Sequence, residues 1–161
     1  MFNYERVNKL QNETWVQTEA RLREELLRFR PEEMSLFLER EKEHLITGPH
    51  PFADYIRDRL REKDILQQEV FLAADLPERY GYKLLSGQKR TRQRDVILRL
   101  CLAAKFTPEE ADTALILYGM VPLSARLPRD AAFLVAFQNC LFDIHAVDAL
   151  LRENRLPPLL P

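Results

Sequence analysis

Apolar residues recur at helical spacing along most of the chain, and the clearest example begins at Phe52. The spacing i, i+3, i+4, i+7, i+8 is typical of one buried face of a helix. The residues with this spacing here are Phe52, Tyr55, Ile56, Arg59 and Leu60. Arg59 fits this face because the long stem of an arginine can lie along apolar surface. The pattern therefore predicts a helix over this stretch.

A pair of helices is predicted upstream. Asn12 or Thr14 can cap the first of them, because both side chains accept hydrogen bonds from free backbone N–H groups. Pro31 suits the first turn of the second, where its missing N–H costs nothing. That helix is expected to end near Gly48, where a glycine and two prolines interrupt the pattern. We therefore expect a domain boundary after an N-terminal helical extension of residues 1–48.

The apolar residues of this extension allow two interpretations. Trp15, Phe29, Phe37 and Leu38 can form a face on which two copies of the chain meet. They can also pack back onto the domain that follows, and this interpretation is favoured because it is the commoner arrangement.

Further along the chain, two short helices are predicted over residues 66–74 and 77–85, and a longer one over residues about 91–104. Pro77 can occupy the first turn of the middle helix. Gly87 is suited to end it, because glycine adopts a positive φ without steric cost. A helix, a short turn, a second short helix and then a Ser-Gly pair is the order found in a helix-turn-helix.

The last third of the chain contains a duplication. FTPEEADTALILYGMVPL (106–123) and FDIHAVDALLRENRLPPL (142–159) match at an offset of 36 residues. The matched pairs are Phe106 with Phe142, Thr107 with Asp143, Asp112 with Asp148, Leu115 with Leu151, Pro122 with Pro158, and Leu123 with Leu159. Two copies are fewer than a solenoid needs. We therefore expect a helical hairpin in residues 124–161 that packs on a domain of residues 52–123.

Charge changes this picture in one window. The chain has 24 Lys and Arg against 25 Asp and Glu, a net charge of −1. Residues 78–94 nevertheless contain six basic residues and one acidic residue, a net charge of +5. A local basic patch is what a polyanionic partner requires, although a solvated surface loop would show the same composition.

Candidate chemistry is sparse elsewhere. Cys101 and Cys140 each stand in an apolar helical context, so we expect small buried hydrophobes rather than a disulfide. The histidines lack metal-ligand spacing, and no glycine-rich phosphate loop or nucleophile motif is present. No apolar run approaches the roughly 20 residues that span a bilayer. We expect a cytoplasmic protein that is not an enzyme, has no cofactor or metal, and does not associate with membranes.

Residues 52–117 carry features of a known family. Four features stand in order without insertion: LREKD at the end of one helix, Gln67 or Gln68 at the start of the next, then AADLPERYGYKLL and SGQKR. This order resembles the lambda-repressor-like, or xenobiotic-response-element (XRE), class of bacterial helix-turn-helix domains. The resemblance implies an all-α, lambda-repressor-like helix-turn-helix domain, here with an N-terminal helical pair and a C-terminal duplicated helical hairpin.

The resemblance also implies a set of site residues. The helix over residues 77–85 would enter the major groove of DNA. The side chains it would present there are Glu78, Arg79, Tyr82 and Lys83. Arginine can read guanine, glutamate can accept from cytosine, and lysine can contact a base or a phosphate. Phosphate contacts are implied for Gln67, Lys89, Arg90 and Arg92.

Two functions from different classes follow. The first is a transcription regulator that binds double-stranded DNA, as a homodimer or with a protein partner, because one short recognition helix makes few contacts. The second is a non-enzymatic protein interaction module built on a degenerate helix-turn-helix. The second is favoured by three departures from the family pattern: Phe71 where a small residue is usual, Asp75 where the turn glycine is usual, and Gly81 where a β-branched residue is usual.

Overall fold

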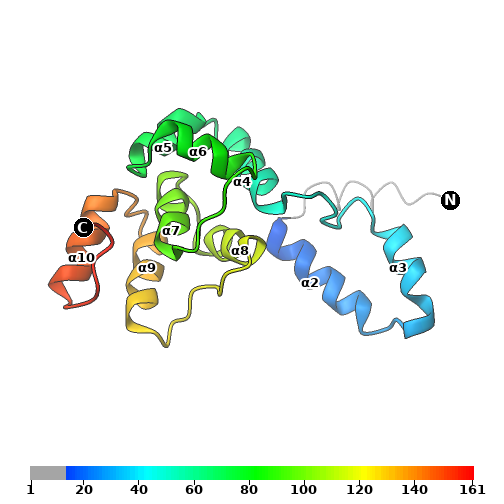
Figure 1. The fold of residues 1–161 in the computed structure, drawn as a ribbon. Helices are drawn as coiled ribbons and strands as arrows, with labels where there is room; N and C mark the ends of the chain where they lie inside the picture. The colour runs from blue at the N-terminus through cyan, green and yellow to red at the C-terminus, as the bar shows by residue number, and fades with distance from the viewer. Residues whose placement is uncertain (1–13) are drawn as a thin grey trace. The chain divides into compact units, whose positions relative to one another are not determined.

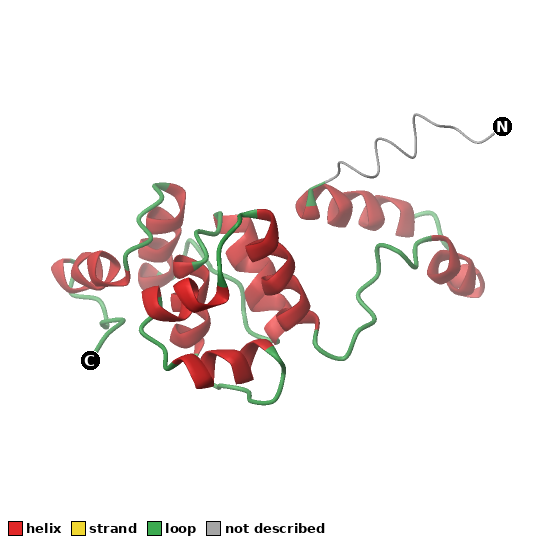
Figure 2. Ribbon diagram, turned by 90° about the horizontal axis from the view of Figure 1, so that it is seen from above, coloured by secondary structure: helices red, strands yellow, loops and turns green. Residues whose placement is uncertain are grey.

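A computed structural model describes residues 14–161 and shows only helices, turns and loops in that range (Figure 2). The all-α fold class is thereby confirmed for the described part of the chain. Backbone contacts divide the chain into two compact units, residues 1–47 and residues 48–161.

The first unit contains α2 (Trp15–Leu26), the short 3-10 helix η1 (Pro31–Glu33) and α3 (Met34–Arg40) (Figure 1). Thr14 caps α2, because its hydroxyl accepts from Gln17 N while the Gln17 side chain accepts from Thr14 N. The other candidate cap, Asn12, lies outside the described residues.

The helix α3 ends at Arg40, well before the predicted end near Gly48. The next residue, Glu41, is buried although it carries a carboxylate. Its oxygens accept from the Arg21 guanidinium of α2 at 3.3 Å and lie 3.1 Å from the His44 ring. The backbone turns at Glu41, and this ion-pair network holds α3 against α2.

The second unit contains seven helices within residues 48–161. They are α4 (Pro51–Glu62), α5 (Gln67–Ala73), α6 (Glu78–Leu85), α7 (Arg94–Ala103), α8 (Pro108–Tyr118), α9 (Pro128–Gln138) and α10 (Ile144–Glu153). Helix α7 contacts α5, α8 and α10 (Figure 1). This position agrees with its sequence, because a helix that is apolar on nearly every side must be buried on every side.

One hydrophobic core runs through the whole second unit. It includes Phe52 of α4, Phe133 of α9 and Leu151 of α10. Residues 124–161 therefore share a core with the helices that precede them, and backbone contacts group them with residues 48–123.

The hairpins α7–α8 and α9–α10 repeat the same contacts. Asp112 accepts a hydrogen bond from Leu123 N at 2.8 Å, and Asp148 accepts one from Leu159 N at the same distance. Each hairpin turns through one residue with positive φ, Lys105 at 57° and Cys140 at 56°.

Phe106 and Phe142 each directly precede the cap of the second helix of their hairpin, Thr107 and Asp143, but they differ in the turn before that cap. Phe106 N donates to the carbonyl of Cys101 across the first turn, whereas Leu141 N makes the equivalent bond in the second. Asp143 is the cap of α10, and the second hairpin thus has one extra residue between its turn and this cap. The offset between the hairpins is therefore 35 residues at the turns, Lys105 and Cys140, and 36 from the caps onward.

The two hairpins are joined by a reciprocal pair of salt bridges (between α7 and α9). Arg94 of α7 contacts Asp130 of α9 at 2.6 Å, and Arg129 of α9 contacts Asp95 of α7 at 2.7 Å. Each arginine also donates to backbone carbonyls at the Pro-Leu corner of its own hairpin. The arginine of each hairpin contacts the aspartate of the other. This reciprocal contact is the one that two halves related by a two-fold axis make.

The equivalent aspartates of the two hairpins are expected to respond oppositely to pH. Burial acts to raise the pKa of Asp148, but hydrogen bonds from Leu160 N, Arg152 and Leu159 N lower the pKa below its usual value. Burial raises the pKa of Asp112, and its single bond from Leu123 N does not reverse this. A lowered pKa stabilises the folded state above the unfolded pKa, and that stability is lost as pH falls through the folded pKa.

We therefore expect Asp148→Asn to lower the free energy of unfolding by about 1 kcal/mol at pH 7, with the difference from wild type shrinking below about pH 4. Asp112→Asn is the matched control and should be neutral or slightly stabilising at pH 7. Urea unfolding between pH 3 and pH 7, followed by circular dichroism, measures both. Equal losses in the two variants would contradict the prediction.

Candidate nucleic-acid interface

The turn between α5 and α6 is closed by a residue with positive φ. Asp75 has φ 53°, and Leu76 N donates to the carbonyl of Phe71 at 2.9 Å. Aspartate is among the few non-glycine residues that adopt this conformation readily. Asp75 therefore takes the place of the glycine that is usual at such a turn.

The close approach of α5 and α6 depends on Phe71 and Gly81. The Phe71 ring is fully buried, and a Cβ atom built on Gly81 would lie 2.4 Å from one of its ring carbons. No side chain larger than hydrogen fits there without moving the ring. Phe71 and Gly81 are thus complementary in volume, with the large side chain on α5 and the residue without a side chain facing it on α6.

The four predicted side chains of α6 lie together. They line one shallow, open hollow of about 520 Å³, formed by Glu78, Arg79, Tyr82 and Lys83. Glu78 accepts a hydrogen bond from the Gln68 side chain at 3.1 Å. The Arg79 and Lys83 side chains make no hydrogen bond or ion pair within residues 14–161. Two cationic groups are therefore available to a partner on this face.

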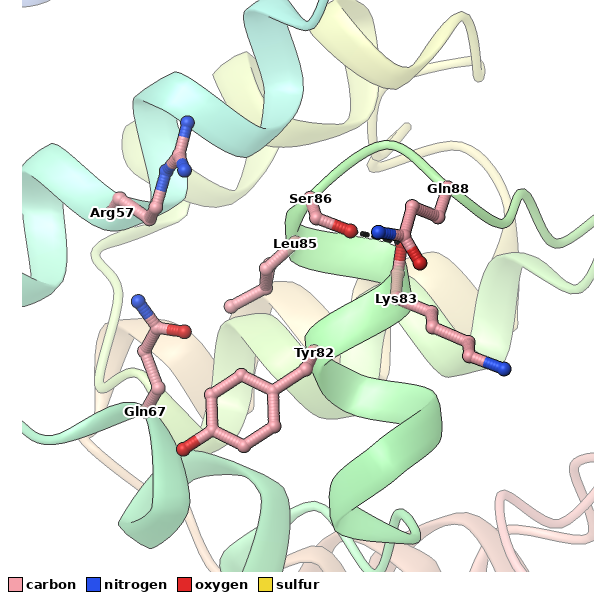
Figure 3. A pocket seen from close by; sticks show the side chains of 7 residues that line it. All are labelled: Arg57, Gln67, Tyr82, Lys83, Leu85, Ser86 and Gln88. Carbon is pink, nitrogen blue, oxygen red and sulfur yellow. Dashed lines mark hydrogen bonds between the residues drawn. The ribbon is translucent and has the colours of Figure 1, made fainter.

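A second hollow, of about 260 Å³, brings Gln67 next to the same helix. The Tyr82 ring extends from α6 towards the Gln67 amide at the start of α5, whereas the Lys83 ammonium points away from them (Figure 3). The rest of the lining is Arg57, Leu85, Ser86 and Gln88. Arg57 comes from α4, where it pairs with Asp54, and nothing in the sequence indicated that it reaches this surface.

The basic loop after α6 divides into two kinds of residue. Lys89 and Arg92 are exposed, and their side chains make no hydrogen bond or ion pair in the described part of the chain. Arg90 instead donates to the Tyr118 carbonyl at 2.8 Å and lies over the Tyr118 ring at 4.7 Å. The Tyr118 hydroxyl accepts from Thr91 N at 2.6 Å. Arg90 therefore anchors the loop to the end of α8, a role that its sequence context did not reveal.

Arg94, the last basic residue of the +5 window, is also occupied, by Asp130 and by two backbone carbonyls. The net charge of the window thus overstates the number of basic side chains that are available to a partner. The basic side chains without an intramolecular partner there are Arg79, Lys83, Lys89 and Arg92.

Other chemistry is sparse in the part that the structure describes. Among residues 14–161 no group of three or more His, Cys, Asp or Glu is placed to hold a metal ion. Both cysteines are free thiols. Cys101 is buried as expected, and burial raises its pKa. The expectation of a buried residue is wrong for Cys140, which is exposed in the turn after α9. In the same residues, no helix has the length and apolar character that crossing a membrane requires.

Comparisons with protein-family models, curated proteins and solved structures found no match to this chain. The shape and charge of the surface around α6 are therefore what bears on its function.

Proposed function

We propose that this protein is a transcription regulator that binds double-stranded DNA through α6 and the basic loop. The observation that carries the proposal is the arrangement of α6, whose outward side chains Glu78, Arg79, Tyr82 and Lys83 share one open hollow. A helix that presents a continuous polar and cationic face can enter the major groove. Arg79 and Glu78 would contact base edges, and Lys83 a base or a phosphate.

The local packing supports a lambda-repressor-like helix-turn-helix. Phe71 and Gly81 exchange volume across α5 and α6, and Asp75 supplies the positive φ of the turn. The three departures thus have structural reasons of their own. They no longer favour a protein interaction module over a DNA-binding domain.

The phosphate contacts are proposed to come from Gln67, Lys89 and Arg92. Lys89 and Arg92 are exposed in the loop that follows α6, and Gln67 lies at the start of α5 in the same hollow as Tyr82. Arg90 contributes by holding the loop in place through Tyr118. A test of phosphate contacts should therefore leave Arg90 intact.

We expect a Lys89→Ala, Arg92→Ala double variant to bind DNA with a shallower dependence on salt. Each lost phosphate contact reduces the slope of log K against log salt by about 0.9, so two lost contacts reduce it by about 1.8. Fluorescence anisotropy of a labelled random-sequence duplex, measured across a salt series with the full chain, gives this slope.

The matched control is an Arg126→Ala, Arg155→Ala double variant. It removes the same charge from two exposed arginines of the second unit whose side chains make no hydrogen bond or ion pair within residues 14–161. Its slope should stay close to wild type. If wild type does not bind duplex DNA at low salt, or if both double variants change alike, the proposal is wrong. The basic loop would then be tested against acidic proteins.

A further inference from the structure

The described part of the first unit buries very little of its apolar surface. Only Phe37 and Glu41 are buried there. Its exposed large apolar side chains are Trp15, Val16, Leu26, Leu27, Met34, Leu36, Leu38 and Ile46. A concentration of exposed apolar residues marks an interaction surface. Helical units of this size commonly need oligomerisation or another staple for stability.

Part of this surface forms a hollow of about 540 Å³ between the end of α2 and α3. We call it the hairpin hollow, and its lining is Arg28, Phe29, Glu33, Leu36, Glu39 and Arg40. Leu36 is 64% exposed, and the edge of the Phe29 ring meets Phe37 at a centroid distance of 5.6 Å. The hairpin hollow thus has apolar groups together with two arginines and two glutamates.

Ion pairs and one ring contact connect the helices on the two sides of the hairpin hollow. The Arg40 guanidinium lies over the Phe29 ring at 5.0 Å and contacts Glu25 of α2 at 3.0 Å. Glu25 and Glu41 also share the Arg21 side chain, which links α2 to α3. A surface held in this way loses little conformational freedom on binding.

Two of the charged groups are placed to pair with a partner. Arg28 is exposed, and its side chain makes no hydrogen bond or ion pair in the described residues. Among residues 14–161, the Glu39 side chain pairs with the exposed Lys42 alone, at 3.2 Å. A uniformly acidic or basic partner would pair with one of them and repel the other. A surface that carries both charges is complementary to itself when two copies meet about a two-fold axis.

We propose that the hairpin hollow is the interface of a homodimer, in which it packs against the same hollow of a second copy. Leu36 and Phe29 supply the apolar centre, and Arg28 of one copy faces Glu39 of the other. This interface does not depend on the proposed function. If that function holds, the homodimer would present two α6 helices to two half-sites on DNA.

The test is the mass of the full chain in sedimentation equilibrium without DNA, from about 1 to about 200 µM. We expect the wild type to reach the dimer mass in this range. Leu36→Glu should raise the dissociation constant at least about thirtyfold, because it places two like charges in the apolar centre. Val135→Glu, which changes an exposed residue of α9, should leave it unchanged.

Charge reversal tests the two-fold pairing itself. Arg28→Glu and Glu39→Arg should each raise the dissociation constant about fivefold, because each sets like charges opposite one another. The double reversal restores opposite charges and should return the constant to within about twofold of wild type. These positions are exposed, so the helix content seen by circular dichroism should not change.

Three results would overturn the proposal. The first is a wild-type chain that stays monomeric up to the highest concentration. The second is a dimer that resists Leu36→Glu. The third is a double charge reversal as weak as, or weaker than, its two single variants. Because no DNA is present, none of these results depends on whether the protein binds DNA.

Discussion

Gly81→Val is expected to lower the free energy of unfolding by about 3 kcal/mol, although glycine is a poor helix residue. Any Cβ on Gly81 would lie 2.4 to 2.6 Å from three carbons of the Phe71 ring, far inside the 3.5 to 4.0 Å of normal carbon contacts. The ring cannot move aside easily because it is 1% exposed and packed in the core. The steric cost therefore exceeds any gain in helix propensity.

Phe71→Ala is expected to be at least as costly alone, by about 3 to 5 kcal/mol, because it leaves a cavity. The Phe71→Ala, Gly81→Val double variant should fill that cavity with the valine side chain. Its loss should be smaller than the sum of the single losses by at least about 2 kcal/mol. Such a coupling would show that the two positions exchange volume.

Urea unfolding followed by circular dichroism measures these energies. Fluorescence is less suitable, because the only tryptophan of the chain, Trp15, belongs to the first unit. Additive losses in the double variant would contradict the packing seen between α5 and α6.

The second large effect is expected at the two reciprocal salt bridges. Removing one of them should lower the free energy of unfolding more than removing the other. The Asp130 side chain is 5% exposed and accepts from Arg94 and from Ser124 N, whereas the Asp95 side chain is 36% exposed. Removing the partner of a buried carboxylate leaves its charge uncompensated, while an exposed one can be solvated by water. We expect Arg94→Met to cost about 3 kcal/mol and Arg129→Met about 1 kcal/mol.

The pH dependence separates these variants further. Burial acts to raise the pKa of Asp130, but hydrogen bonds from Arg94 and Ser124 N and the charge of Arg94 lower it below its usual value. The stability from this lowered pKa is present above the unfolded pKa and is lost as pH falls through the folded value. The cost of Arg94→Met should therefore be largest near pH 7 and shrink below about pH 4.

The measurement is urea unfolding of both variants at pH 7 and at about pH 3. Equal costs for Arg94→Met and Arg129→Met would contradict the role of burial. A cost for Arg94→Met that does not change with pH would show that lost packing of the arginine stem, not its charge, dominates.

Much of the helical pattern could be predicted from the sequence, because it depends on residues close in the chain. The apolar spacing from Phe52 to Leu60 predicted α4, and Gly87 ends α6 with φ 78° as expected. Thr107 caps α8 through a capping box of nearby residues, in which Glu110 N donates to its hydroxyl. Caps and helical faces repeat every three or four residues, so a single sequence carries their signal.

The candidate site was predictable only in part. The sequence placed Glu78, Arg79, Tyr82 and Lys83 on one helix face, and the structure brings them together in one hollow. The sequence could not show that Arg90 is held by Tyr118, which lies 28 residues further along the chain. Whether a charged side chain is available to a partner depends on neighbours that are distant in sequence.

The sequence by itself determined the all-α class, most helix positions, and the concentration of basic residues after α6. Only the tertiary structure decided that Phe71 and Gly81 are one packing unit, that α3 stops where Glu41 turns inward, and which basic residues remain available. The physical reason is the range of the interactions. Helix formation and capping act within a turn or two of the chain, whereas side-chain volume, burial and ion pairing are settled between segments that meet only when the chain folds.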